Sequence, residues 1–146
     1  MRRKVSVVGG GELSAASAER IRTDDYADVV VDDVAEIPGS DIVVLAATDG
    51  DVLAQIRDRA PNAVVVVTDG SVDEVCRATL FPRARIIGVE ADPAAVAEVV
   101  EAVALDRGKV LTCTVRCEGE HGIEGEFAAV QVRVGAGGVK EILERV

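Results

Sequence analysis

Aromatic residues are nearly absent from this 146-residue chain: Tyr26, Phe81 and Phe127 are the only three, and there is no tryptophan. Proteins that bind single-stranded nucleic acid stack bases on such side chains, so this class is disfavoured. Basic residues are also scarce, because 16 Lys and Arg stand against 26 Asp and Glu, a formal net charge of −10. So acidic a surface repels phosphate backbones and anionic lipids. We therefore expect no nucleic-acid partner and no membrane partner.

Long apolar stretches are missing as well. No run approaches the eighteen or more apolar residues of a membrane-spanning helix. The basic start, Met1–Lys4, leads into a short apolar run and not into the longer apolar segment of a secretory signal. The sequence therefore favours a cytoplasmic protein.

The three cysteines, Cys76, Cys113 and Cys117, form an odd number with no disulfide framework. Cys113 and Cys117 lie four residues apart in an expected strand, which separates them by roughly 13 Å. Two ligands of one zinc ion cannot be that far apart. Cys117 and His121 across a turn are the remaining metal candidates. We expect no metal site, but buried thiols and a solvated histidine.

Valine is abundant, and it occurs in short continuous runs. Such runs predict strands that are covered on both faces, which is typical of a parallel sheet. The expected strands are residues 4–8, 28–32, 42–46, 63–67 and 85–88. The expected helices between them are residues 12–22, 51–59, 71–79 and 94–105. This alternation predicts an α/β fold, a Rossmann-like, mostly parallel five-stranded sheet with helices on both faces.

Local signals refine this expectation. Ser71 with Glu74 predicts a capping box at the start of a helix, and Asp92-Pro93 predicts another helix start. On the first helix we expect Leu13, Ala16 and Ile21 to face inward. The gap from residue 33 to 40 is too short for a helical crossover, so a short loop must join the second and third strands.

The last third of the chain has a different pattern. Residues 109–117 and 126–134 predict an antiparallel hairpin across a glycine-rich turn. Residues 135–138 are expected to close the hairpin and lead into a short amphipathic helix, residues 139–146. Its apolar face would contain Val139, Ile142, Leu143 and Val146. We therefore divide the chain into a Rossmann-like dinucleotide-binding region, residues 1–108, and a hairpin-and-helix region, residues 109–146, packed as one compact unit.

The first thirty-three residues contain the strongest functional pattern. An apolar run leads into Gly9-Gly10-Gly11, a helix follows, and a second apolar run ends in Asp32-Asp33. A dinucleotide site uses such glycines for a sharp turn and for close approach of the backbone to pyrophosphate, which lies at the helix N-terminus. An acid at the end of the second strand accepts hydrogen bonds from the ribose hydroxyls. Ser14 replaces the third glycine of the fingerprint, which weakens the pattern.

We therefore expect NAD as the cofactor. A 2′-phosphate, as in NADP, would meet the charges of both Asp32 and Asp33. The expected cofactor-binding residues are Gly9, Gly10, Gly11, Glu12, Leu13, Asp33, Ala46 and Ala47.

Ten blocks of the chain, taken in order, resemble the lactate and malate dehydrogenases. They are residues 4–11, 27–34, 40–44, 61–67, 85–88, 101–103, 106–107, 109–111, 119–123 and 134–144. The resemblance covers nearly the whole chain, with long stretches missing between the blocks. It implies that Gly9, Gly11 and Asp33 hold NAD.

The departures from this family concern catalysis. Residues 46–51 run into a helix without the arginines of the family's mobile loop, and the segment with the proton-transfer histidine is missing. His121, the only histidine, falls in the late hairpin turn. Reduction of a 2-keto acid needs a proton donor and a carboxylate clamp. The resemblance thus implies a NAD-binding protein without the usual catalysis; Arg57 and Arg59 are minor candidates for substrate contacts.

Three alternatives stay open. The chain could be a divergent but active NAD-dependent malate or 2-hydroxyacid dehydrogenase. It could be a nucleotide-sensing regulatory module, because residues 46–51 are also similar to a motif of domains that gate potassium transport. It could have a purely structural role. Loss of the catalytic region would uncover apolar helix faces, so we also expect a homo-oligomer, a dimer.

Overall fold

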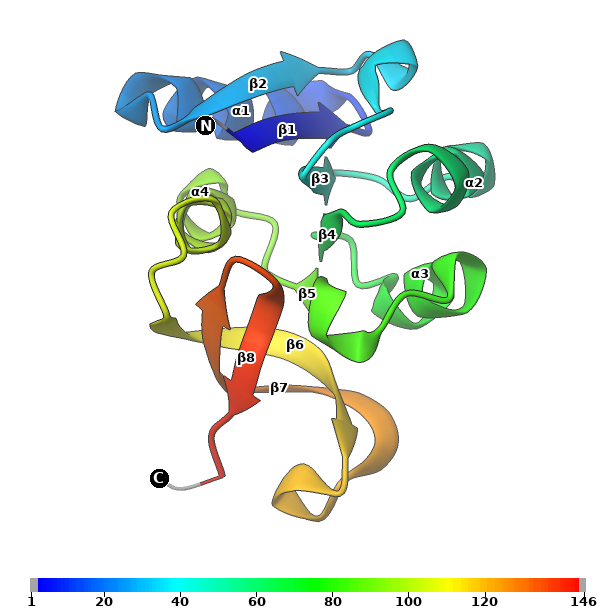
Figure 1. Ribbon diagram of the computed structural model, residues 1–146, viewed down its shortest axis with the longest axis vertical. Helices are drawn as coiled ribbons and strands as arrows, with labels where there is room; N and C mark the ends of the chain where they lie inside the picture. Colours follow the sequence, from blue (N-terminus) through cyan, green and yellow to red (C-terminus); the bar gives the residue numbers. More distant parts are fainter. Residues whose placement is uncertain (1–2, 145–146) are drawn as a thin grey trace.

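The computed structural model describes residues 3–144. One eight-stranded sheet runs through the molecule, in the order β2-β1-β3-β4-β5-β6-β7-β8 (Figure 1). The strands are β1 (Arg3–Val8), β2 (Ala27–Val31), β3 (Ile42–Leu45), β4 (Val64–Val67), β5 (Ile86–Gly88), β6 (Lys109–Glu118), β7 (Glu124–Gly135) and β8 (Gly138–Ile142). The helices are α1 (Gly11–Asp24), α2 (Gly50–Arg59), α3 (Val72–Thr79) and α4 (Pro93–Ala104), with short 3-10 turns η1 (Val34–Glu36), η2 (Arg83–Arg85) and η3 (Glu120–Gly122).

The first five strands are parallel, and helices cover both of their faces. In Figure 1, α1 and α4 lie on one side of the sheet, and α2 and α3 lie on the other. Every residue of β3 and β4 is buried, because these valine-rich strands lie in the middle of the parallel region with a helix layer on each side. The predicted α/β fold with a mostly parallel sheet is confirmed. No helix within residues 3–144 has the length and apolar character needed to cross a bilayer.

The connection from β2 to β3 is short, as the sequence predicts. It passes from one side of β1 to the other through the single turn η1 instead of a full crossover helix. The Asp33 side chain stabilises this turn by accepting a hydrogen bond from the backbone N–H of Ala35 at 3.1 Å. Ile37 is fully buried and fixes the end of the connection in the core.

The helix starts agree only partly with the sequence signals. Asp92 accepts a hydrogen bond from the Ala95 N–H at 3.2 Å, with Pro93 in the first turn, so this cap is confirmed. Ser71 occupies the N-cap position of α3 but makes no side-chain capping bond, so the predicted capping box is wrong. Instead, the Ser71 N–H donates to the carboxylate of Asp69 at 3.0 Å.

The buried face of α1 also differs from the expectation. Ile21 is buried as predicted, but Ala16 is exposed and Leu13 is only half-buried. The helix instead turns small residues toward the sheet and α4: Ser14, Ser17 and Ala18. Small side chains allow close approach of the helix, and their weak apolar character hides this face from a periodicity search.

Residues 109–142 extend the sheet with antiparallel strands. β6 and β7 pair from Lys109↔Val134 to Cys117↔Glu126, and β5 joins β6 through Gly88↔Thr114. The predicted short helix at residues 139–146 is wrong: residues 138–142 form β8, which pairs with β7, and Gly135 lies opposite Gly138 across a tight turn. Positions 145–146 lie outside the described residues. The two expected regions thus share one continuous sheet.

Candidate dinucleotide site

The glycine turn after β1 lies against the end of β3. Gly9 has a φ of +119°, and a Cβ at this position would overlap the backbone nitrogen of Ala47. The same Cβ would lie 3.0 Å from the carbonyl carbon of Ala46. Only glycine therefore allows the ends of the two strands to approach so closely, and the predicted residues Gly9, Ala46 and Ala47 do lie together.

The next two glycines face open space. Gly10 and Gly11 have φ values of +74° and +81°, and a Cβ on either would meet no atom within 4 Å. Gly10 is the N-cap of α1 and provides no side-chain cap, so the first N–H groups of the helix have no capping partner there. Free N–H groups and the positive end of the helix dipole attract anions. Glu12 is exposed in the same first turn, which places one negative charge beside this position.

The two acids after β2 have different roles in the structure. Asp32, with a φ of +50°, accepts a hydrogen bond from the Gly10 N–H at 2.9 Å. Asp33 is exposed and bonds only the turn that follows it, through Ala35 N–H. Sequence reasoning singled out Asp33 and missed the link between Asp32 and the glycine turn. The signal for it is the position of Asp32 directly after the last residue of β2.

A cavity of about 510 Å³ opens at this edge of the sheet. It lies beside β1 and β3, where the chain order reverses, which is the usual position of ligands in open α/β sheets. Two valines and an alanine contribute apolar surface, and several polar groups surround them. The lining residues are Gly9, Val34, Ala47, Thr48, Asp49, Asp51, Val52 and Gln55.

A hydrogen-bonded clamp joins the ends of β3 and β4. Thr48 donates to the carboxylate of Asp69 twice, from its backbone N–H at 2.8 Å and from its hydroxyl at 3.1 Å. Partial burial alone would raise the pKa of Asp69, but hydrogen bonds from Ser71 and Thr48 outweigh it and lower the pKa. Asp69 is thus an ionised group that holds Thr48 in place at the rim of the cavity.

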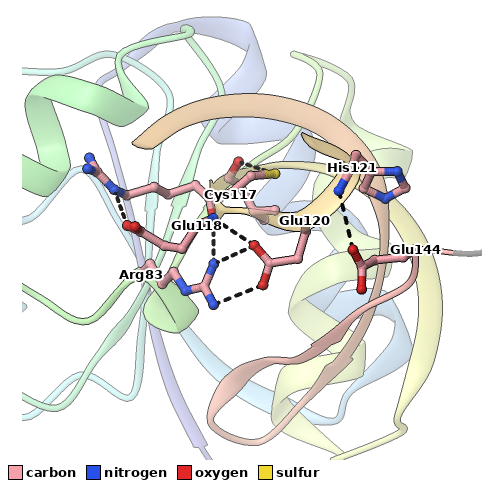
Figure 2. A network of polar contacts seen from close by, with 8 residues as sticks. Arg83, Cys117, Glu118, Glu120, His121 and Glu144 are labelled. Carbon is pink, nitrogen blue, oxygen red and sulfur yellow. Dashed lines mark hydrogen bonds and ion pairs between the residues drawn. The ribbon is translucent and has the colours of Figure 1, made fainter. Parts of the chain in front are cut away.

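The other singled-out residues lie apart from this edge. His121 is in the turn between β6 and β7, and its Nε2 lies 2.8 Å from the carbonyl oxygen of Leu143. Figure 2 shows His121 beside Glu144, with Arg83 and Glu120 paired nearby. Arg57 is exposed on α2 and pairs with Asp58 at 2.9 Å.

The thiols of Cys113 and Cys117 are buried on β6. Burial raises the pKa of Cys113 to about 11, so this thiol is protonated and unreactive at neutral pH. Within residues 3–144, no group of three or more His, Cys, Asp and Glu side chains is arranged to hold a metal ion.

No family model matches the chain. It is similar in sequence to malate dehydrogenases: 33% identical over 85 residues to that of Salinibacter ruber, and 46% identical over 63 residues to that of Thermomicrobium roseum. These stretches amount to 54% and 41% of this chain but to only 27% and 20% of the two relatives. The chain thus matches well under two thirds of their length.

Solved structures share the fold. The lactate dehydrogenase from Cryptosporidium parvum, complexed with lactic acid and β-nicotinamide adenine dinucleotide, has a TM-score of 0.89 at 16% identity, covering 100% of this chain and 91% of that chain. The malate dehydrogenase from Salinibacter ruber has a TM-score of 0.89 at 18% identity, covering 99% and 90%. Because 85 residues are 27% of the Salinibacter ruber sequence, that relative is roughly twice as long as this chain. The aligned part of the Salinibacter ruber structure, 90% of that chain, therefore includes segments that have no counterpart in this chain.

The sheet order, the glycine turn and the paired helix layers define a Rossmann-like α/β protein. Within this class, the chain is a shortened relative of the lactate and malate dehydrogenases. The resemblance seen in the sequence is confirmed.

Proposed function

We propose that this chain is a NAD-binding protein that lacks the usual catalysis of the lactate and malate dehydrogenases. The observation that carries the proposal is the open glycine turn at the cavity. The close contact of Gly9 with Ala47 fixes the turn, while Gly10 and Gly11 leave the start of α1 accessible to a pyrophosphate. The Cryptosporidium parvum neighbour, a complex with the dinucleotide, supports the same ligand.

The residues around the turn fit this cofactor. Val34 and Val52, which both line the cavity, offer apolar surface for an adenine ring. Asp33 is exposed beside Val34 at the end of β2 and would accept the ribose hydroxyls. The charges of Asp32 and Asp33 would repel a 2′-phosphate, so we propose NAD over NADP. When bound, NAD supplies a hydride acceptor, and this chain's residues orient it at the strand ends.

The position of His121 supports the proposed lack of the usual catalysis. It lies in the turn of β6 and β7, whereas the cavity is at the end of β1 and β3, several strands away in the sheet. Arg57, another candidate, is engaged with Asp58. No residue among those that line the cavity is a histidine or an arginine. The cytoplasmic location and self-association stay predictions from the sequence.

A titration tests this function. Truncating a charge-assisted hydrogen bond costs about 1.5–3 kcal/mol, so Asp33→Ala should weaken the binding of NAD at least tenfold. The measurement is isothermal calorimetry with NAD and NADP. Asp73→Ala is the control, because Asp73 lies on α3 and pairs only with Arg77 on the surface. Equal binding to Asp33→Ala and the parent protein would remove Asp33 from the site.

A further inference from the structure

A second hollow lies beside the first turns of α1, which follow the glycine turn. Its volume is about 380 Å³. It is formed by the first turns of α1 and by the connection from β5 into α4, whereas the larger cavity is formed by residues after β1, β2 and β3. The lining residues are Glu12, Leu13, Ala16, Ala91 and Pro93.

The two hollows match the two halves of a dinucleotide. A Rossmann sheet consists of two mononucleotide-binding halves, and the half with the acid at the end of its second strand takes the adenosine ribose. In this chain that acid follows β2, next to the larger cavity. The hollow between α1 and the β5–α4 connection therefore receives the nicotinamide half, an assignment that rests on the proposed function.

The charge of this second hollow has one sign. Glu12 is the only charged residue that lines it, and Asp92 is exposed between the lining residues Ala91 and Pro93. No lysine or arginine is among the lining residues. Arg20 lies eight residues further along α1, at a distance of about 12 Å. It lines a neighbouring hollow together with the acids Glu19 and Asp24. Exposed charges at that distance are largely screened at physiological salt.

The oxidised nicotinamide ring has one positive charge, and the reduced ring has none. Both forms have the same two phosphates and the same adenosine, so a carboxylate beside the ring distinguishes only the ring charge. We propose that this site binds oxidised NAD in preference to NADH, with Glu12 as the residue that sets the preference. In water, the attraction between opposite unit charges at a separation of about 6 Å corresponds to roughly a threefold change in a binding constant, and this sets the size of the effect that we expect.

Three ligands and three variants test this inference. Oxidised NAD, NADH and ADP-ribose are titrated by calorimetry at one low ionic strength. The parent protein should bind oxidised NAD at least threefold more tightly than NADH. We compare the ratio of the dissociation constant of NADH to that of oxidised NAD. Glu12→Gln should bring this ratio close to one, and Glu12→Lys should lower it further. The ratio cancels any effect of Glu12 on the shared phosphates.

Glu74→Gln is the matched control. Glu74 is exposed on α3, outside the residues that line either hollow, and its replacement removes the same single charge from the molecule. This variant should keep the parental ratio. A parental ratio at or below one, or an equal ratio in Glu12→Gln and the parent, overturns the preference while leaving NAD binding intact. Absence of binding by all three ligands overturns the proposed function itself.

Discussion

The parallel and antiparallel halves of the sheet differ in how much polar backbone they leave exposed. At the strand ends of the parallel half, Gly10 and Gly11 present backbone to open space, next to a cavity. In and beside the antiparallel half, charged side chains bind one another, as in Arg83–Glu120 and Lys140–Asp106, at 3.0 and 2.8 Å. Asp32 accepts the Gly10 N–H, but the first N–H groups of α1 have no capping side chain and can bind a ligand, whereas the paired side chains hold segments of the chain together. The difference agrees with the proposed binding site in the first half and with a supporting role for the second.

The pairs of the antiparallel half connect segments that are distant in sequence. Arg83, in η2, binds both carboxylate oxygens of Glu120 and the carbonyl oxygen of Arg116. Figure 2 shows Arg83 facing Glu120, with Glu118 beside them. These bonds add side-chain contacts between the late hairpin and the segment before β5, whereas the pairing of β5 with β6 makes the sheet continuous. In this part of the chain the polar groups are structural.

Gly9→Ala should have the largest effect of these variants on stability, because it changes the glycine turn on which the proposed binding depends. The new Cβ would overlap Ala47 N at a φ of +119°, so the ends of β1 and β3 must separate. We expect a loss of about 3 kcal/mol in the free energy of unfolding, measured by urea denaturation. Gly10→Ala, with a φ of +74°, a ψ of 177° and open space around the Cβ, should lose less, about 1–2 kcal/mol. Equal losses would show that close packing does not fix the turn.

The parallel half could be predicted well from the sequence because its signals are local. Short valine runs end at glycine, proline or acidic residues, and the bounds of β1 to β5 follow these signals within about two residues. The glycine turn and the adjacent acids are likewise contiguous in sequence. What the sequence did not provide is the choice between Asp32 and Asp33 as the partner of Gly10, which depends on the φ of +50° at Asp32.

The antiparallel half was predicted less well because its last strand depends on distant pairing. Val139 and Ile142 fit a helical period, yet the eight residues of the predicted helix are too few to separate helix from strand by periodicity. Pairing with β7 decides the matter, since Arg133 and Val134 lie opposite Glu141 and Val139. Gly138 packs against the backbone of Ala84, and only glycine permits this contact. No local sequence pattern predicts it.

Two buried serines of the parallel half differ in their hydrogen bonding. The Ser17 hydroxyl on α1 is fully buried without a hydrogen-bond partner, whereas Ser40 shares a hydrogen bond of 2.7 Å with Ser6. An unsatisfied buried hydroxyl costs about 1–2 kcal/mol, so Ser17→Ala should raise the free energy of unfolding by about 1 kcal/mol. Ser40→Ala should lower it by a similar amount, because it leaves Ser6 without that partner. Thermal and urea unfolding measure both, and a loss of stability in Ser17→Ala would contradict the assignment.

The smallest effect is expected in the antiparallel half, at the Arg83–Glu120 pair. The guanidinium of Arg83, together with the Glu118 N–H, lowers the pKa of Glu120 from its ordinary 4.5 to about 2. A carboxylate with a lowered pKa stabilises the folded state above its ordinary pKa, and this contribution is lost as the pH falls through the folded value. The melting temperature of Glu120→Gln should therefore lie below that of the parent by a constant small amount from pH 5 to 7. The gap should close between about pH 4.5 and 2.

Glu74→Gln controls for the change in net charge, and because the pair is partly exposed, its effect is modest. If the gap stays open at pH 2, Glu120 acts through packing and not through its charge; if NAD affinity also falls in Glu120→Gln, the division between a binding half and a supporting half is wrong.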